Sequence, residues 1–228
     1  HRSVAAGWRT YANSTGAMSI GVYTSATGYA SFALGDTTSA SGQSSFAAGA
    51  SAHADGVASF ALGYKTSASG NKSTALGSLN RSEGSFSTTL GQSNKATGQW
   101  SIAGGYKTSA TEEKAVTFGN DNIASGISST ALGSYNTASG NFSTTMGQSN
   151  KATSAYYSVA LGSYNTSQGL HSTTLGRLNK AIGTNSLAFG YSSSATETNS
   201  IAFGNQSIAS GVGAAAIGTS NTSQGIYS

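Results

Sequence analysis

Small and large side chains alternate along this chain in a five-residue phrase that returns throughout its length. The phrase reads Ser59-Phe60-Ala61-Leu62-Gly63 in one unit. Its final glycine recurs every 14 residues from Gly7 to Gly218, with a single 15-residue step before Gly162. A short period kept over sixteen units predicts stacked coils rather than a globule with a cleft.

A second, weaker phrase follows seven residues after the first, as in Thr38-Ser39-Ala40-Ser41-Gly42. Each unit is therefore expected to hold two short strands separated by two turns, each strand about five residues long. Period-2 alternation places Ser, Ala and Gly on one face of a strand and the intervening residues on the other. With the small residues inside, the pattern predicts an all-β parallel solenoid of about sixteen 14-residue coils.

The outward positions of the first phrase carry larger apolar side chains, which we call the apolar face. In a single chain this face would exceed the few hundred Å² of apolar surface that soluble monomers usually expose. The pattern therefore predicts parallel self-association of identical chains, although alternation does not fix their number. The predicted interface residues are Phe32, Leu34, Phe46, Phe60, Leu62, Leu76, Leu90, Val116, Phe118, Leu132, Met146, Val159, Leu161, Leu175, Leu187, Phe189, Ile201 and Phe203.

The turns carry a recurrent asparagine three residues after the first-phrase glycine. We expect a structural ladder here, because Asn tolerates left-handed backbone angles and stacked Asn side chains can bond from coil to coil. The glycines are expected to serve corners that need positive φ or lack room for a Cβ. Where the second-phrase glycine is replaced, at Ser14, Glu112, Ser154 and Glu197, a wider or differently capped corner is expected. The asparagines are Asn80, Asn94, Asn122, Asn136, Asn150, Asn165, Asn179 and Asn221.

Composition narrows the function classes. Charged residues are only 8%, there are 31 glycines, and Pro and Cys are absent, yet the constant register argues for order rather than disorder. The formal charge of +4 is scattered, so no nucleic-acid partner is expected. No stretch approaches the roughly 18 apolar residues of a membrane span, and no signal peptide is visible.

An enzymatic function is not expected. His1, His53 and His171 lie in distant units, and no triad, metal-ligand or paired-carboxylate spacing emerges. The sequence therefore predicts no catalytic, metal-binding or cofactor-binding residues and no cofactor.

The repeat resembles the YadA-like head of trimeric autotransporter adhesins. The resemblance rests on phrases such as Ser158-Val159-Ala160-Leu161-Gly162 and Ser200-Ile201-Ala202-Phe203-Gly204 in one register along essentially the whole chain. It implies a left-handed parallel β-roll, a homotrimer, and a single head domain over residues 1–228 of a longer protein. It further implies adhesion to host extracellular-matrix proteins of the collagen, fibronectin or laminin class, or to host cell receptors. The implied location is the bacterial cell surface, with outer-membrane anchoring through a C-terminal part that this stretch does not include.

A stack of repeats offers no cleft, so binding is expected on columns of side chains. Turn aromatics are the first candidates, although they can equally pack within the stack. The 15-residue unit has its extra residue within Ser154-Ala155-Tyr156-Tyr157 and is the best local candidate, because a bulge there would push tyrosines outward; a harmless insertion is the alternative. An ice-binding or purely structural solenoid is the alternative, since outward Thr recurs at Thr74 and Thr88 without forming an uninterrupted array. The candidate binding residues are Phe86, Trp100, Phe142, Tyr156, Tyr157, Tyr64, Lys65, Tyr106 and Lys107.

Overall fold

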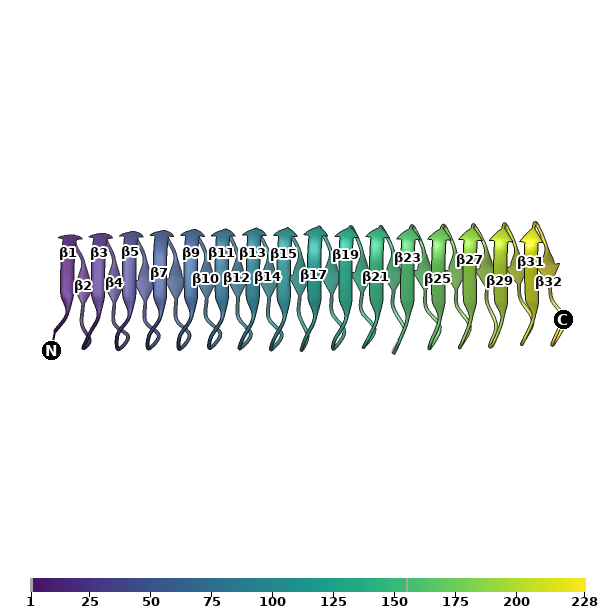
Figure 1. Cartoon of the computed structure of the whole chain (residues 1–228), viewed down its shortest axis with the longest axis horizontal. Helices are drawn as coiled ribbons and strands as arrows, with labels where there is room; N and C mark the ends of the chain where they lie inside the picture. The colour runs from purple at the N-terminus through teal and green to yellow at the C-terminus, as the bar shows by residue number, and fades with distance from the viewer. Residues whose placement is uncertain (1, 155) are drawn as a thin grey trace. The chain divides into compact units, whose positions relative to one another are not determined.

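The computed structural model describes residues 2–154 and 156–228, which form strands and turns with no helix. The chain divides into two compact units, residues 1–114 and 115–228. Each unit is a parallel β-solenoid of eight coils, and each coil holds one long and one short strand (Figure 1).

In the first unit the long strands pair side by side in chain order, and so do the short ones. The register joins residues one repeat apart, as in Phe60 to Thr74 and Gly63 to Gly77. The long strands are β1 (Val4–Trp8), β3 (Met18–Val22), β5 (Phe32–Asp36), β7 (Phe46–Ala50), β9 (Phe60–Tyr64), β11 (Thr74–Ser78), β13 (Thr88–Gln92) and β15 (Ile102–Tyr106). The short strands are β2 (Tyr11–Ala12), β4 (Ser25–Ala26), β6 (Ser39–Ala40), β8 (His53–Ala54), β10 (Ser67–Ala68), β12 (Arg81–Ser82), β14 (Lys95–Ala96) and β16 (Ser109–Ala110).

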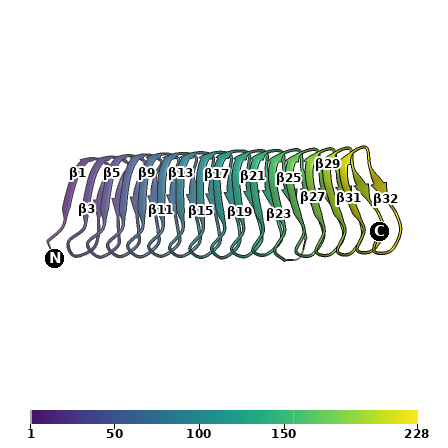
Figure 2. The same cartoon turned by 45° about the vertical axis from the view of Figure 1, so that its right-hand side comes forward.

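The second unit repeats this arrangement, and Figure 2 shows its coils from an oblique angle. Its register shifts by one residue where β21 pairs with β23, so that Thr144 lies opposite Val159. The long strands are β17 (Val116–Asn120), β19 (Thr130–Ser134), β21 (Thr144–Gln148), β23 (Val159–Ser163), β25 (Thr173–Arg177), β27 (Leu187–Tyr191), β29 (Ile201–Asn205) and β31 (Ala215–Thr219). The short strands are β18 (Ile123–Ala124), β20 (Thr137–Ala138), β22 (Lys151–Ala152), β24 (Thr166–Ser167), β26 (Lys180–Ala181), β28 (Ser194–Ala195), β30 (Ile208–Ala209) and β32 (Thr222–Ser223).

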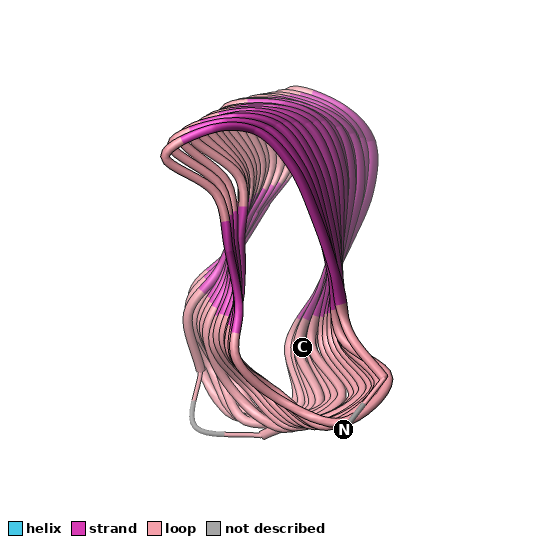
Figure 3. Ribbon diagram, turned by 90° about the vertical axis from the view of Figure 1, so that its left-hand side faces the viewer, coloured by secondary structure: helices cyan, strands magenta, loops and turns pink. Residues whose placement is uncertain are grey.

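Small side chains fill the interior of the coils, as the alternation predicts. Seen end-on, the long and the short strand of a coil lie on opposite sides of it (Figure 3). In one coil Ser31, Ala33 and Ala40 are fully buried, whereas Leu34 points outward. Only small side chains allow the two strands to approach so closely, so the predicted all-β parallel solenoid of about sixteen coils is confirmed.

Strand bounds differ from the expected five-residue phrases. The long strands begin one residue late and continue past the glycine, because the Gly35 backbone, at φ 124°, still pairs with the next coil. The short strands hold only two residues, as in Ser39–Ala40. Ser41 and Gly42, the last two residues of that phrase, lead into the turn that closes the coil, whereas Thr38 precedes the strand.

The first-phrase glycines are required on both expected grounds. Gly63 has a φ of 130°, and a Cβ built there would overlap the carbonyl oxygen of Gly77 in the next coil. The second-phrase glycine Gly42 has no positive φ, but its Cβ would overlap the carbonyl oxygen of Gly56. Close approach of successive coils therefore explains both glycine columns.

The asparagine ladder exists, but the backbone role assigned to it is wrong. The left-handed residue is the one before each asparagine, for example Leu79 at φ 58° before Asn80. Asn80 is itself buried. Its side-chain Nδ2 donates to the carbonyl oxygens of Leu76 and Gly91, and its Oδ1 accepts from the backbone N–H of Asn94 at 2.8 Å. Because the bonds run inside the coil, the ladder ties successive coils together from within.

The expectation of differently capped corners is wrong at Ser14 and Glu197 but is confirmed at Ser154. There the Ser154 Oγ accepts from the Tyr156 backbone N–H at 3.3 Å and donates to the Tyr156 carbonyl oxygen at 3.1 Å. An ordinary corner is closed by the Ser31 amide donating to the Gly28 carbonyl at 3.2 Å. At Ser14 and Glu197 the equivalent bonds, from Ala17 and Ser200, are both 3.1 Å. These positions need no positive φ, and the replacements therefore leave the corner unchanged.

Candidate interaction surfaces

The apolar face follows the outward side of the long strands in each unit. In the first unit the rings of Phe32 and Phe46 stack at 6.0 Å and those of Phe46 and Phe60 at 4.8 Å. Beside them Leu34 and Leu62 are 41% and 43% exposed. Transfer of apolar side chains of this size out of water is favourable, so the face is suited to burial against another surface.

All eighteen predicted interface residues lie on this outward side, and none is buried within its own coil. Threonines such as Thr74 and Thr88 share the face with leucines, so no continuous threonine array forms. The half-buried members are Phe32, Phe46, Leu76, Val116, Leu132, Val159, Leu161, Leu187 and Phe189. The exposed members are Leu34, Phe60, Leu62, Leu90, Phe118, Met146, Leu175, Ile201 and Phe203. Their role in a subunit interface stays a prediction.

One turn of the first unit carries a column of four side chains, Lys72, Phe86, Trp100 and Lys114, which we call the first-unit ladder. The Phe86 and Trp100 rings stack at 5.8 Å. The Lys72 ammonium lies 5.0 Å from the centre of the Phe86 ring and the Lys114 ammonium 5.5 Å from that of Trp100. Both rings keep over 40% of their surface exposed. The ring faces are thus occupied, and the ring edges remain for a partner.

The corresponding turn of the second unit also stacks aromatic rings. Tyr157 stacks with Phe142 at 5.1 Å and with His171 at 5.2 Å, and Tyr156 lies tilted beside it at 6.2 Å. The expected bulge falls within Ser154-Ala155-Tyr156-Tyr157, of which Ala155 lies outside the described residues. Next to it, Tyr156 and Tyr157 are half exposed, as expected for an outward-facing pair.

The remaining candidates lie at the opposite turn and form no common site with the aromatic ladders. Tyr64 ends β9, and the Lys65 ammonium lies 5.2 Å from the centre of its ring. Lys107 lies 5.0 Å from the Tyr106 ring in the same way. The sequence predicted Phe86 and Trp100 as binding residues but not Lys72 and Lys114, although the 14-residue spacing of these four residues places them in one column.

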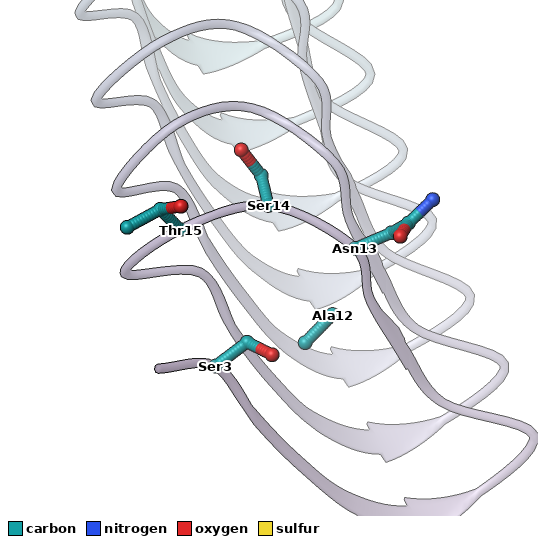
Figure 4. Close-up of a pocket in the computed structure, with 5 residues that line it drawn as sticks. All are labelled: Ser3, Ala12, Asn13, Ser14 and Thr15. Atoms are coloured by element: carbon teal, nitrogen blue, oxygen red, sulfur yellow. The ribbon is translucent and has the colours of Figure 1, made fainter. Parts of the chain in front are cut away.

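A hollow of about 290 Å³ opens at the first coil of the first unit, lined by Ser3, Ala12, Asn13, Ser14 and Thr15 (Figure 4). It lies at the end of the stack, where β1 and β2 pair on one side only. Ser3, Ala12 and Ser14 continue the interior columns of Ala17, Ala26 and Gly28, whereas Asn13 and Thr15 are exposed at the rim. We therefore interpret it as the open end of the coil interior.

Among residues 2–154 and 156–228, no group of three or more His, Cys, Asp or Glu side chains could hold a metal ion. The described part of the chain also contains no helix long and apolar enough to cross a membrane.

Fold and surface together define a parallel β-solenoid with one apolar face and turns that carry columns of aromatic and basic side chains. The model of the YadA head domain repeat matches residues 12–38, 26–52, 40–66, 54–80, 124–150 and 181–207, which together cover more than half of the chain. The chain therefore belongs to the YadA head family, which is found in adhesin-type surface proteins that are generally trimeric. No match was found among curated protein sequences.

Proposed function

We propose that this chain is the head of a trimeric adhesin, in which three parallel copies bury their apolar faces against one another. The observation that carries the proposal is the outward apolar face, on which Leu34, Phe60 and Leu62 remain exposed in the single chain. Burying one large apolar side chain contributes about 1.5–3 kcal/mol. One or two such side chains per coil supply a large driving force for association, and family membership supports three as the number of copies.

The proposed ligands are host proteins of the extracellular matrix, of the collagen, fibronectin or laminin class, or receptors on host cells. The proposed location is the bacterial cell surface, with the head held to the outer membrane by another part of the protein. The turn columns support binding rather than catalysis, because aromatic side chains with exposed edges are enriched in recognition surfaces. We accordingly propose a function without an enzymatic step.

The test of the assembly is a pair of charge substitutions on the apolar face. Phe60→Asp with Leu62→Asp places two carboxylates in the proposed interface and is expected to convert the trimer to a monomer in light scattering. The matched control is Ser67→Asp with Ser69→Asp, which adds the same charge to the other side of the same coil and should keep the mass. A trimer that survives the first pair would rule out the apolar face as the interface.

The test of adhesion is an array of matrix proteins and receptor ectodomains probed with the purified head. Saturable binding to at least one of them is expected. If no ligand binds while the head is trimeric, the proposed assembly stands, the adhesion proposal fails, and the purely structural solenoid is the better interpretation. A measurement of thermal hysteresis on the same sample examines the ice-binding alternative, for which no activity is expected.

A further inference from the structure

The first-unit ladder presents positive potential along its outer edge. An aromatic ring carries partial negative charge on its faces and partial positive charge at its edge. The two outer ring faces are covered by the Lys72 and Lys114 ammonium groups, and the inner faces stack on each other. The groups that remain exposed form a line, in which the edges of the Phe86 and Trp100 rings lie between the ammonium groups of Lys72 and Lys114.

The backbone does not explain why aromatic residues occupy this column. Phe86 and Trp100 have φ values of 60° and 57°, a left-handed conformation that is unusual for bulky residues. The same column of the second unit holds Asn185, Asn199 and Gly213, residue types that adopt these angles readily. It also holds Phe142, Tyr157 and His171, which stack on one another at similar φ values. Ring stacking can offset part of the cost of this left-handed conformation. Stacking does not require a lysine on either side of the two rings, so the lysines need another explanation.

The spacing of the ladder matches that of an extended peptide. Lys72 and Lys114 are three coils apart, which is about 14 Å for strands that lie 4.7–4.9 Å apart. An extended chain rises about 3.3–3.4 Å per residue, so four residues also span about 13.5 Å. Residues i, i+2 and i+4 of such a chain point to the same side. Acidic residues at i and i+4 would therefore meet the two lysines, and residue i+2 would lie over the ring edges.

We propose that the first-unit ladder binds an extended acidic peptide segment of the pattern acid-x-apolar-x-acid, lying across the coils. This peptide would be a partner of the proposed adhesin head. The proposal rests on that function because it requires this turn to lie outside the subunit interface. Lys114 also pairs with Glu113 at 2.9 Å, with both side chains largely exposed. Because exposed ion pairs contribute little, a peptide carboxylate can compete for Lys114. No carboxylate of the described residues pairs with Lys72.

The probe is a blocked peptide, Gly-Ser-Asp-Ser-Leu-Ser-Asp-Ser-Gly, displayed densely on a biosensor surface so that an oligomeric head binds with avidity. The spacing control, Gly-Ser-Leu-Ser-Asp-Ser-Asp-Ser-Gly, has the same composition with its acids two residues apart. The 228-residue chain is expected to bind the first peptide more tightly by up to about fivefold, the difference that one exposed ion pair of about 1 kcal/mol makes. Equal binding of both peptides would overturn the proposal.

Substitutions then locate the site. Lys72→Gln with Lys114→Gln should weaken binding of the first peptide about fivefold or more, whereas Glu113→Gln should strengthen it by removing the competing carboxylate. The matched control is Lys65→Gln with Lys107→Gln, a pair with the same three-coil spacing at the opposite turn but without stacked rings between. An equal or larger loss in this control shows that lysine spacing alone suffices and refutes the role of the ladder.

Two further readouts separate this proposal from its alternatives. The mass of every variant is measured by light scattering, so that loss of assembly is distinguished from loss of peptide binding. Heparin is tested as a competitor: if it binds through Lys72 and Lys114 while the first peptide does not bind, the ladder recognises an anionic polysaccharide and the peptide proposal is wrong.

Discussion

The buried asparagine ladder allows a quantitative prediction at Asn136. Its Nδ2 donates to the carbonyl oxygens of Leu132 at 2.9 Å and Gly147 at 2.8 Å, and its Oδ1 accepts from the Asn150 amide nitrogen at 3.0 Å. Asn136→Ala removes these three bonds and leaves the Asn150 backbone N–H buried without its acceptor. It also removes two bonds of 3.1 Å, from the Asn136 Nδ2 to the Asn122 Oδ1 and from the Asn150 Nδ2 to the Asn136 Oδ1, but those partners keep other bonds. The side chain faces the coil interior, where water does not replace these bonds.

The expected loss follows from these contacts. A buried donor left unpaired costs about 1–3 kcal/mol, and each of the other two bonds contributes about 1 kcal/mol. Asn136→Ala should therefore lower the free energy of unfolding by about 3–5 kcal/mol. Asn136→Ser should cost less, because Ser193 in the same column still donates to the Gly204 carbonyl at 3.1 Å.

The assay is urea-induced unfolding followed by circular dichroism at one fixed protein concentration, since association contributes to the apparent stability. The matched control is Asn141→Ala at a half-buried turn position, which removes one solvent-exposed bond that the Ile127 backbone N–H donates to the Asn141 Oδ1 at 2.9 Å. Its cost should stay below about 1 kcal/mol. If the two alanine variants lose the same stability, the interior ladder does not hold the coils together.

Two further substitutions test the turns and corners. Gly63→Ala introduces a Cβ that overlaps the carbonyl oxygen of Gly77 at a φ of 130°, so the chain should fold poorly or unfold at clearly lower urea concentration; wild-type stability would show that the corner can open. Tyr156→Ser with Tyr157→Ser removes half-exposed rings and should leave the circular dichroism spectrum unchanged while lowering binding to whichever matrix ligand the array identifies; unaltered binding would exclude this turn as the site.

The sequence predicted those features of the fold that repeat in side-chain size. Alternation placed Ala33 inside and Leu34 outside, because an interior this narrow accepts only small side chains. It did not reveal which turn residue adopts the left-handed conformation. That residue is Leu79 rather than Asn80, because Asn80 gives more stability through buried hydrogen bonds than it would through a backbone preference.

The candidate surfaces were predicted in part. The column of Phe86 and Trp100 followed from the 14-residue spacing, but the sequence could not show that the ring faces stack on each other. The flanking Lys72 and Lys114 were overlooked because surface lysines are usually only solvated. Their significance depends on ammonium-to-ring distances, which only the folded coils define.

The proposed adhesin head requires that the apolar face be an interface between three copies of the chain. Sedimentation equilibrium of the 228-residue protein at micromolar concentration measures this directly. A mass three times that of the 22.6 kDa chain is predicted. A folded species with the mass of one chain would contradict the account.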